Sequence, residues 1–216
     1  MSRVICIAGE SGSGKTTSLR NLDPKTTFII DADRKGLSWK GWKAQYNKEA
    51  KNYIQTSDVD KIKSLLQNIS EKATHIKTVV IDTLNTIMVD DEVKRMKEKG
   101  YDKWIDLAQC VWELVSDAHL YRDDLTVVFM AHTQTERDDS GFYFTRIKTS
   151  GRKLEKICLE SKFTTVLIAK CIDGRYIFET HAKNSTAKSP MGAFEENEID
   201  NDVAEVIKRL EEYENA

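Results

Sequence analysis

The sequence has little of what marks a secreted, membrane-spanning or zinc-binding protein. Its four cysteines form no C-x-x-C pair, its four histidines have no zinc-site spacing, and no apolar run approaches the roughly 20 residues that span a bilayer. The N-terminus leads into an apolar run without the pattern of a signal peptide. We therefore expect reduced cysteines, no transition-metal site, no membrane partner and a cytoplasmic location.

Proline and excess charge are also scarce. Two prolines and no low-complexity tract argue against linkers, so residues 1–216 are expected to form a single domain. A formal net charge of −2 excludes a globally basic nucleic-acid binder, but it leaves room for a local basic groove.

Residues 9–16 read Gly-Glu-Ser-Gly-Ser-Gly-Lys-Thr and match G-x-x-x-x-G-K-[ST], the pattern of a phosphate-binding loop. In such a P-loop, backbone N–H groups surround phosphate oxygens, the lysine reaches the β- and γ-phosphates, and the threonine hydroxyl ligates Mg²⁺. Apolar residues 4–8 predict a buried strand before it, and residues 17–21 continue as a helix after it. The predicted nucleotide-binding residues are Gly9, Glu10, Ser11, Gly12, Ser13, Gly14, Lys15, Thr16 and Thr17.

Two further predicted strands end in aspartates. Residues 26–31 lead into Asp31-Ala32-Asp33, and residues 78–82 end in Asp82. Open α/β sheets bind their ligands at the carboxyl ends of their strands. Downstream of a P-loop, the second strand has the Walker B pattern, so Asp82 is predicted to hold Mg²⁺ together with Thr16.

A fourth apolar strand, residues 125–131, is followed by polar residues 132–136. We expect this strand to neighbour the Walker B strand, which would place His132 and Gln134 near the nucleotide. One of them would then sense the γ-phosphate or orient water. The alternative is that His132 is a hydrogen-bonded structural residue.

Residues 137–156 are polar and basic, with aromatic residues in their midst. Cationic and aromatic side chains together suit single-stranded DNA, because they contact phosphates and stack on bases. The predicted DNA-binding residues are Arg137, Phe142, Tyr143, Arg146, Lys148, Arg152 and Lys153. The alternative is a β-hairpin in which Phe142 and Phe144 face the core. Residues 36–43, GLSWKGWK, could likewise bind single-stranded nucleic acid through tryptophans and lysines. The favoured interpretation is that the tryptophans cover an edge of the core.

The remaining elements alternate between helices and strands. Helical periodicity follows Ser57, which with Asp60 resembles a capping box, and two more amphipathic helices are predicted between residues 84 and 118. Residues 163–172 and 175–179 flank Asp173-Gly174 and predict a hairpin at the sheet edge. A helix capped within residues 200–202 follows.

In its order of motifs, the chain resembles the RecA-like ATPase core. It is most similar to the phage P-loop nucleotide-binding proteins that include RecA-core single-strand annealing proteins. The resemblance rests on the P-loop, the strands ending in IIDAD, VVIDT and MAHTQ, the polar segment after them and the later hairpin with trailing lysines. It implies an α/β fold of three layers, with a mostly parallel central sheet and an antiparallel edge hairpin. It also implies ATP and Mg²⁺ as cofactors and, for a phage protein, the host cell cytoplasm.

The resemblance also assigns roles to residues. Lys15 and Asp82 belong to the catalytic machinery, and Asp33 stands where RecA-type cores carry a catalytic glutamate; its shorter side chain implies slow hydrolysis. Gln134 or His132 takes the γ-phosphate sensor position. Residues 135–153 correspond to a DNA-binding loop. The lysines after the hairpin, Lys183 and Lys188, would reach a neighbouring subunit's nucleotide, which implies a homo-oligomer with the ATP site at the subunit interface.

Three function hypotheses follow. The first is an ATP-hydrolysing phage protein that acts on single-stranded DNA in recombination or replication, through strand annealing or ATP-gated binding, with a single-stranded-DNA-binding protein as a partner. The second is a non-catalytic ATP-gated adaptor or helicase loader, and the third is a small-molecule kinase for nucleosides or nucleotides. A GTPase is disfavoured because no N-K-x-D motif occurs.

Overall fold

The structure is a computed structural model that describes residues 1–98, 102–137, 140–149 and 158–216. Nine strands lie within these residues and join in sheet pairing. They are β1 (Arg3–Gly9), β2 (Thr27–Asp31), β3 (Tyr53–Ile54), β4 (Thr78–Asp82), β5 (Thr126–Arg137), β6 (Tyr143–Ile147), β7 (Thr165–Ile172), β8 (Arg175–Glu179) and β9 (Glu198–Asp200).

The strand order is β3-β2-β4-β5-β1-β7-β8-β9, and β6 pairs with β5 off this path. Pairing is parallel from β3 through β7, and it is antiparallel from β7 through β9. This confirms the predicted mostly parallel sheet with an antiparallel edge. Strand β9 was missed by the sequence prediction, and it lies outside β8, so the β7–β8 hairpin is not itself the sheet edge.

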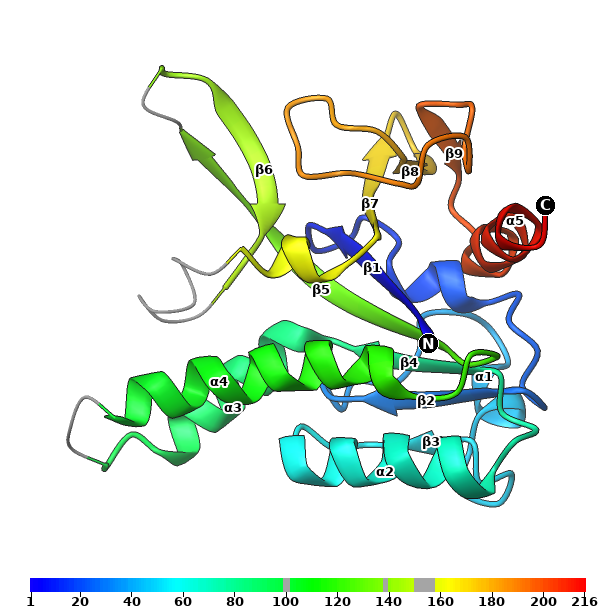
Figure 1. The fold of residues 1–216 in the computed structure, drawn as a ribbon, viewed down its shortest axis with the longest axis vertical. Coiled ribbons are helices and arrows are strands. Elements are labelled where there is room, and N and C mark those ends of the chain that lie inside the picture. The colour runs from blue at the N-terminus through cyan, green and yellow to red at the C-terminus, as the bar shows by residue number, and fades with distance from the viewer. Residues whose placement is uncertain (99–101, 138–139, 150–157) are drawn as a thin grey trace.

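Helices cover both faces of the sheet (Figure 1). The α-helices are α1 (Trp42–Gln45), α2 (Val59–Lys72), α3 (Leu84–Lys94), α4 (Asp102–Asp117) and α5 (Val203–Glu214), and the short 3₁₀ helices are η1 (Thr16–Leu19), η2 (Ala118–Leu120) and η4 (Leu159–Lys162). Across the described part of the chain, no helix is long and apolar enough to cross a membrane. The helix that the sequence predicted over residues 17–21, after the P-loop, is present only as the four-residue 3₁₀ helix η1.

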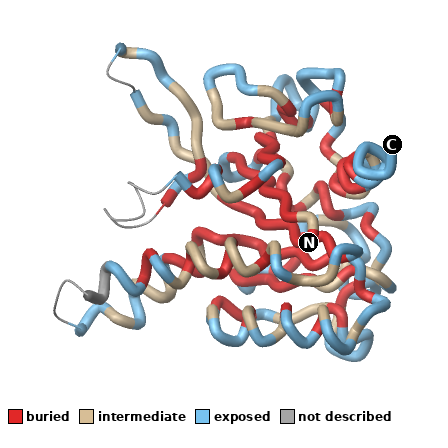
Figure 2. Tube along the Cα trace, in the orientation of Figure 1, coloured by how far each residue is buried: buried red, intermediate tan, exposed pale blue. Residues whose placement is uncertain are grey.

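Two apolar cores result, one on each face of the sheet. Successive residues of a strand point to opposite faces, so Cys6 joins the core under α2, α3 and α4, whereas Ile7 joins the core under η1 and α5. Strand β4 and the first half of β5 are fully buried, and β1 is buried from Val4 onward, as Figure 2 shows for the centre of the sheet. Trp39 and Trp42 pack against the second core, which supports the core-edge interpretation of residues 36–43. The architecture is the three-layer α/β fold typical of P-loop NTPases.

Strand β5 differs most from the prediction. Residues 132–136 are not beyond the strand but belong to it, because β5 continues to Arg137 and pairs there with β6. The polar segment after it therefore begins as a β-hairpin and not as a loop. Of the two aromatic residues that the hairpin alternative placed in the core, Phe142 is 69% exposed and Phe144 is only partly buried. That detail of the alternative is wrong.

The N-terminus of α2 is capped by Asp58, one residue after the predicted Ser57. The Asp58 carboxylate accepts a hydrogen bond from the Lys61 N–H at 3.0 Å, which satisfies one unpaired donor of the first turn. The Ser57 hydroxyl instead donates to Asp90 at 2.6 Å, on the neighbouring helix α3.

We predict that Asp58→Ala lowers the free energy of unfolding by about 1 kcal/mol, because it removes the N-cap acceptor. Asp58→Asn is the matched control, since asparagine caps nearly as well and should retain most of the stability. Urea denaturation measures both. An alanine variant as stable as the wild type would contradict the assignment of this cap.

Candidate nucleotide site

The P-loop connects the carboxyl end of β1 to η1. Gly14 has φ +89°, a left-handed conformation, and a Cβ there would lie 2.7 Å from the Tyr176 ring. A Cβ on Gly9 would lie 2.5 Å from the Ser13 hydroxyl oxygen. Two glycines of the motif are thus required by backbone conformation or by close approach.

Lys15 lies within the curve of this loop and is only 6% exposed. Its ammonium group donates to the carbonyl oxygens of Gly9 and Glu10, each at 2.8 Å. Burial lowers the pKa of Lys15 to about 8, against the opposing attraction of Asp82. The ammonium group is therefore held at the loop by carbonyl oxygens alone, and it forms no ion pair with a described carboxylate.

Thr16 and Asp82 meet as the sequence predicted. The Thr16 hydroxyl donates to Asp82 Oδ2 at 2.7 Å. Asp82 is 1% exposed, and its other oxygen, Oδ1, accepts no hydrogen bond from any described residue. Burial raises the pKa of this carboxyl group. A hydroxyl and a buried, partly unpaired carboxylate are hard oxygen donors, so this pair fits Mg²⁺.

Asp33 lies beside Asp82, where its N–H is 3.3 Å from the Asp82 carbonyl oxygen. Its carboxylate accepts a hydrogen bond from Thr83 Oγ1 at 3.0 Å, and further bonds from Thr86 Oγ1 and the Lys35 ammonium group. Burial opposes ionisation, but the bonds from Lys35 and Thr86 outweigh it and lower the pKa of Asp33. Asp33 is a restrained carboxylate and not a free base.

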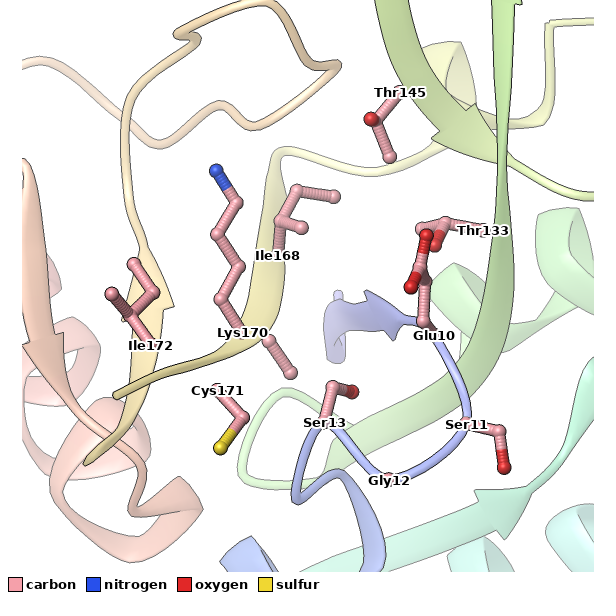
Figure 3. Close-up of a pocket in the computed structure, with 11 residues that line it drawn as sticks. Glu10, Ser11, Gly12, Ser13, Thr133, Thr145, Ile168, Lys170, Cys171 and Ile172 are labelled. Atoms are coloured by element: carbon pink, nitrogen blue, oxygen red, sulfur yellow. The ribbon is translucent and has the colours of Figure 1, made fainter. Parts of the chain in front are cut away.

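A cavity of about 360 Å³ opens along the P-loop. Its lining residues are Ser11, Gly12, Gly14, Lys15, Thr16, Thr17, Lys35, Ser38, His132 and Tyr176. A second cavity, of about 350 Å³, shares Ser11 and Gly12 of the loop with the first and reaches β7 and the base of the β5–β6 hairpin (Figure 3). Glu10, Ser13, Thr133 and Lys170 are among its lining residues.

A family model described as AAA domain matches residues 1–191. The chain belongs to the AAA domain family. Membership indicates nucleotide binding, with ATPase activity as the usual chemistry of the fold, and it agrees with the P-loop geometry described above. No curated protein matches the chain.

The AAA domain brings His132 to the nucleotide cavity but not Gln134. The backbone N–H of His132 donates to Asn85 Oδ1 at 2.6 Å, and His132 lines the cavity along the P-loop. Gln134 instead donates to Glu136 at 2.5 Å and lines neither cavity. Between the two predicted γ-phosphate sensors, the geometry favours His132.

Five of the seven predicted DNA-binding residues are described, and they lie on or beside the β5–β6 hairpin, which projects from the sheet (Figure 1). Tyr143 is 63% exposed near its tip, and the Arg137 guanidinium lies 5.8 Å from its ring centroid. Arg146 lies near two carboxylates, at 3.5 Å from Glu136 and 3.8 Å from Glu160. Lys148 is exposed at the base. Arg152 and Lys153 lie outside the described residues.

Lys183 and Lys188 line neither cavity. The Lys183 N–H donates to Glu179 at 3.3 Å, and the Lys188 backbone exchanges two hydrogen bonds with Val166, at 2.8 and 2.9 Å. Within one subunit they are apart from Lys15. Their action on a neighbouring subunit's nucleotide stays a prediction.

Sequence reasoning missed three residues of the nucleotide cavity, which are Lys35, Ser38 and Tyr176. Lys35 could have been found from the sequence, because it lies two residues after Asp33, which was itself a predicted site residue. Tyr176 had none, since it lies on β8, far along the chain from the P-loop.

We predict that the pKa of His132 lies below the ordinary value of 6.5, because burial and the Lys15 cation both disfavour its charged form. The stability that this neutral histidine contributes is therefore lost as pH falls through 6.5, where the unfolded chain takes up the proton first. An NMR titration of the His132 ring, assigned with His132→Gln, measures the pKa. Lys15→Met should raise it, and a wild-type pKa above 6.5 would contradict the assignment.

Proposed function

We propose that this AAA domain is a Mg²⁺-dependent ATPase that acts on single-stranded DNA in phage recombination or replication. The observation that carries the ATPase half is the buried Thr16–Asp82 pair, which has an unpaired carboxylate oxygen beside the Lys15 ammonium. The DNA half rests on the exposed aromatic tip of the β5–β6 hairpin. The phage role rests on the resemblance in motif order.

Each residue of the site has a distinct role toward the nucleotide in this proposal. Thr16 and Asp82 would hold Mg²⁺, which supplies positive charge at the phosphate oxygens. Lys15 exchanges the carbonyl oxygens of Gly9 and Glu10 for the β- and γ-phosphates. His132 contacts the terminal phosphate, and Asp33 orients water and accepts its proton.

The hairpin would carry the nucleic acid. Phe142 and Tyr143 present their rings for base stacking, and Arg137 and Lys148 approach the backbone phosphates. Glu10 to Ser13 and Thr133, at the hairpin base, line the second cavity together, and in this proposal nucleotide binding at the loop shifts the hairpin across that cavity. In this proposal the oligomer brings Lys183 or Lys188 to a neighbouring site, and a single-stranded-DNA-binding protein supplies the substrate strand.

A non-catalytic, ATP-gated adaptor or helicase loader is the second candidate. The restraint of Asp33 by Lys35, Thr83 and Thr86 favours it, because a carboxylate with three donors is a weak base.

Steady-state ATP turnover separates the two candidates. We predict Mg²⁺-dependent hydrolysis that single-stranded DNA stimulates, and a loss of at least about 100-fold in Lys15→Met because phosphate charge is no longer neutralised. Lys25→Met, at an exposed lysine outside both cavities, is the matched control and should keep full activity. ATP binding without turnover would support the adaptor instead.

We also predict that a Phe142→Ala, Tyr143→Ala variant binds a fluorescent oligo(dT) about tenfold or more weakly, since two stacking rings are lost. Tyr213→Ala removes an aromatic ring that is 41% exposed on α5, far along the chain from the hairpin, and should bind like the wild type. Fluorescence anisotropy in the presence of Mg²⁺ and ATP measures both. Equal affinity of all three proteins would contradict the hairpin assignment.

A further inference from the structure

The segment between β2 and α1, which carries Lys35, is fixed at Gly36. The Gly36 N–H donates to Asp31 Oδ2 at 2.8 Å. Gly36 has φ +79°, and a Cβ there would lie 2.7 Å from the Trp42 ring. The Asp31 carboxylate also accepts from the Tyr53 hydroxyl at 2.5 Å, so it is fixed in turn. The residue before Gly36, Lys35, is therefore presented from an anchored backbone.

Lys35 enters the same cavity as Lys15 and Thr16. Its ammonium group forms an ion pair with Asp33, while Asp82 and Asp31 add to the negative charge around it. Lys35 also contributes to the lowered pKa of Lys15, after the larger effect of burial, which means that the two cations repel each other across the cavity. A polyanion between them would turn this repulsion into two attractions.

The position of Lys35 indicates which end of a bound nucleotide it would contact. Its partner Asp33 lies against the Asp82 backbone, and Asp82 bonds to Thr16 at the predicted Mg²⁺ position. Thr16 and Asp82 would hold Mg²⁺, which would supply positive charge at the terminal phosphates. On this placement Lys35 would face the terminal phosphates and not the base.

We propose that Lys35 is a second phosphate-binding cation, specific for the terminal phosphate of a nucleoside triphosphate, and that without triphosphate it restrains Asp33. This inference rests on the proposed function of the site. When a triphosphate binds, Lys35 exchanges the Asp33 carboxylate for the γ-phosphate. Asp33 then keeps two hydroxyl donors, Thr83 and Thr86, which orient it, and it gains a free position that accepts a proton from water.

Isothermal titration of a non-hydrolysable ATP analogue and of ADP, each with Mg²⁺, tests the specificity. Lys35→Met is expected to weaken the analogue about tenfold or more and ADP less than threefold, because only the analogue carries the terminal phosphate. Lys35→Arg should restore most of the lost affinity. Lys40→Met makes the same change at an exposed lysine on the same segment, outside the cavity, and should alter neither affinity. Equal weakening of both nucleotides, or of neither, would overturn the proposal.

The restraint of Asp33 is tested separately with Asp33→Asn, which frees Lys35. This variant is expected to bind the analogue several-fold more tightly than the wild type, and the gain should vanish in the Asp33→Asn, Lys35→Met double variant. A gain that persists in the double variant would reflect only lost repulsion between Asp33 and phosphate, and it would overturn the restraint.

The outcomes also separate this inference from the proposed function. If wild-type protein binds neither nucleotide, the proposed nucleotide site fails. If wild-type protein binds both, Lys15→Met abolishes binding and Lys35→Met leaves the ratio of the two affinities unchanged, only the role of Lys35 fails.

Discussion

Parallel strand pairing is the constraint on which the rest of the structure depends. Parallel strands end at the same edge of a sheet, and the register here places Gly9 opposite His132 and Asp31 opposite Asp82. Residues from four distant parts of the chain thus converge without any direct link between them. The Thr16–Asp82 hydrogen bond then joins the P-loop to the centre of the sheet.

The site brings together opposed charges, most of them buried and one, Lys35, exposed. Lys15 and Lys35 provide two cations, whereas Asp33, Asp82 and Asp31 provide carboxylates of which two are almost fully buried. Such a cluster is costly unless its members are paired. Asp33 pairs with Lys35, and Asp31 Oδ2 accepts hydrogen bonds from Gly36 and Tyr53. Asp31 and Asp82 each keep one buried oxygen without a partner among the described residues, and the Lys15 ammonium group has only carbonyl partners. Of these groups, Asp82 and Lys15 are the ones that the P-loop pattern assigns to metal and phosphate.

The sequence predicted the elements whose signals are local. The P-loop, the aspartates at strand ends and the apolar strands follow from spacing and periodicity, so the fold and the Thr16–Asp82 contact were expected. The continuation of β5 through His132 was not, because residues 132–137 are all polar, and such a run forms a strand only when a partner such as β6 pairs with it. Tyr176 joins the cavity through tertiary packing, for which no spacing rule applies, whereas Lys35 lies two residues after Asp33 and could have been singled out with it. The Asp58 cap was displaced by one residue because the Ser57 hydroxyl found a partner on α3.

Strand β5 is continuous over its twelve residues, which at about 3.3 Å per residue amounts to roughly 40 Å. Its first half is hydrogen-bonded between β1 and β4 in the core, and its second half carries the hairpin. His132 lies where the two halves meet. Because neighbouring strands hold only its first half, a small tilt of β5 at the nucleotide site displaces the hairpin by an amount that grows with distance from the site. The aromatic tip of the hairpin therefore moves furthest.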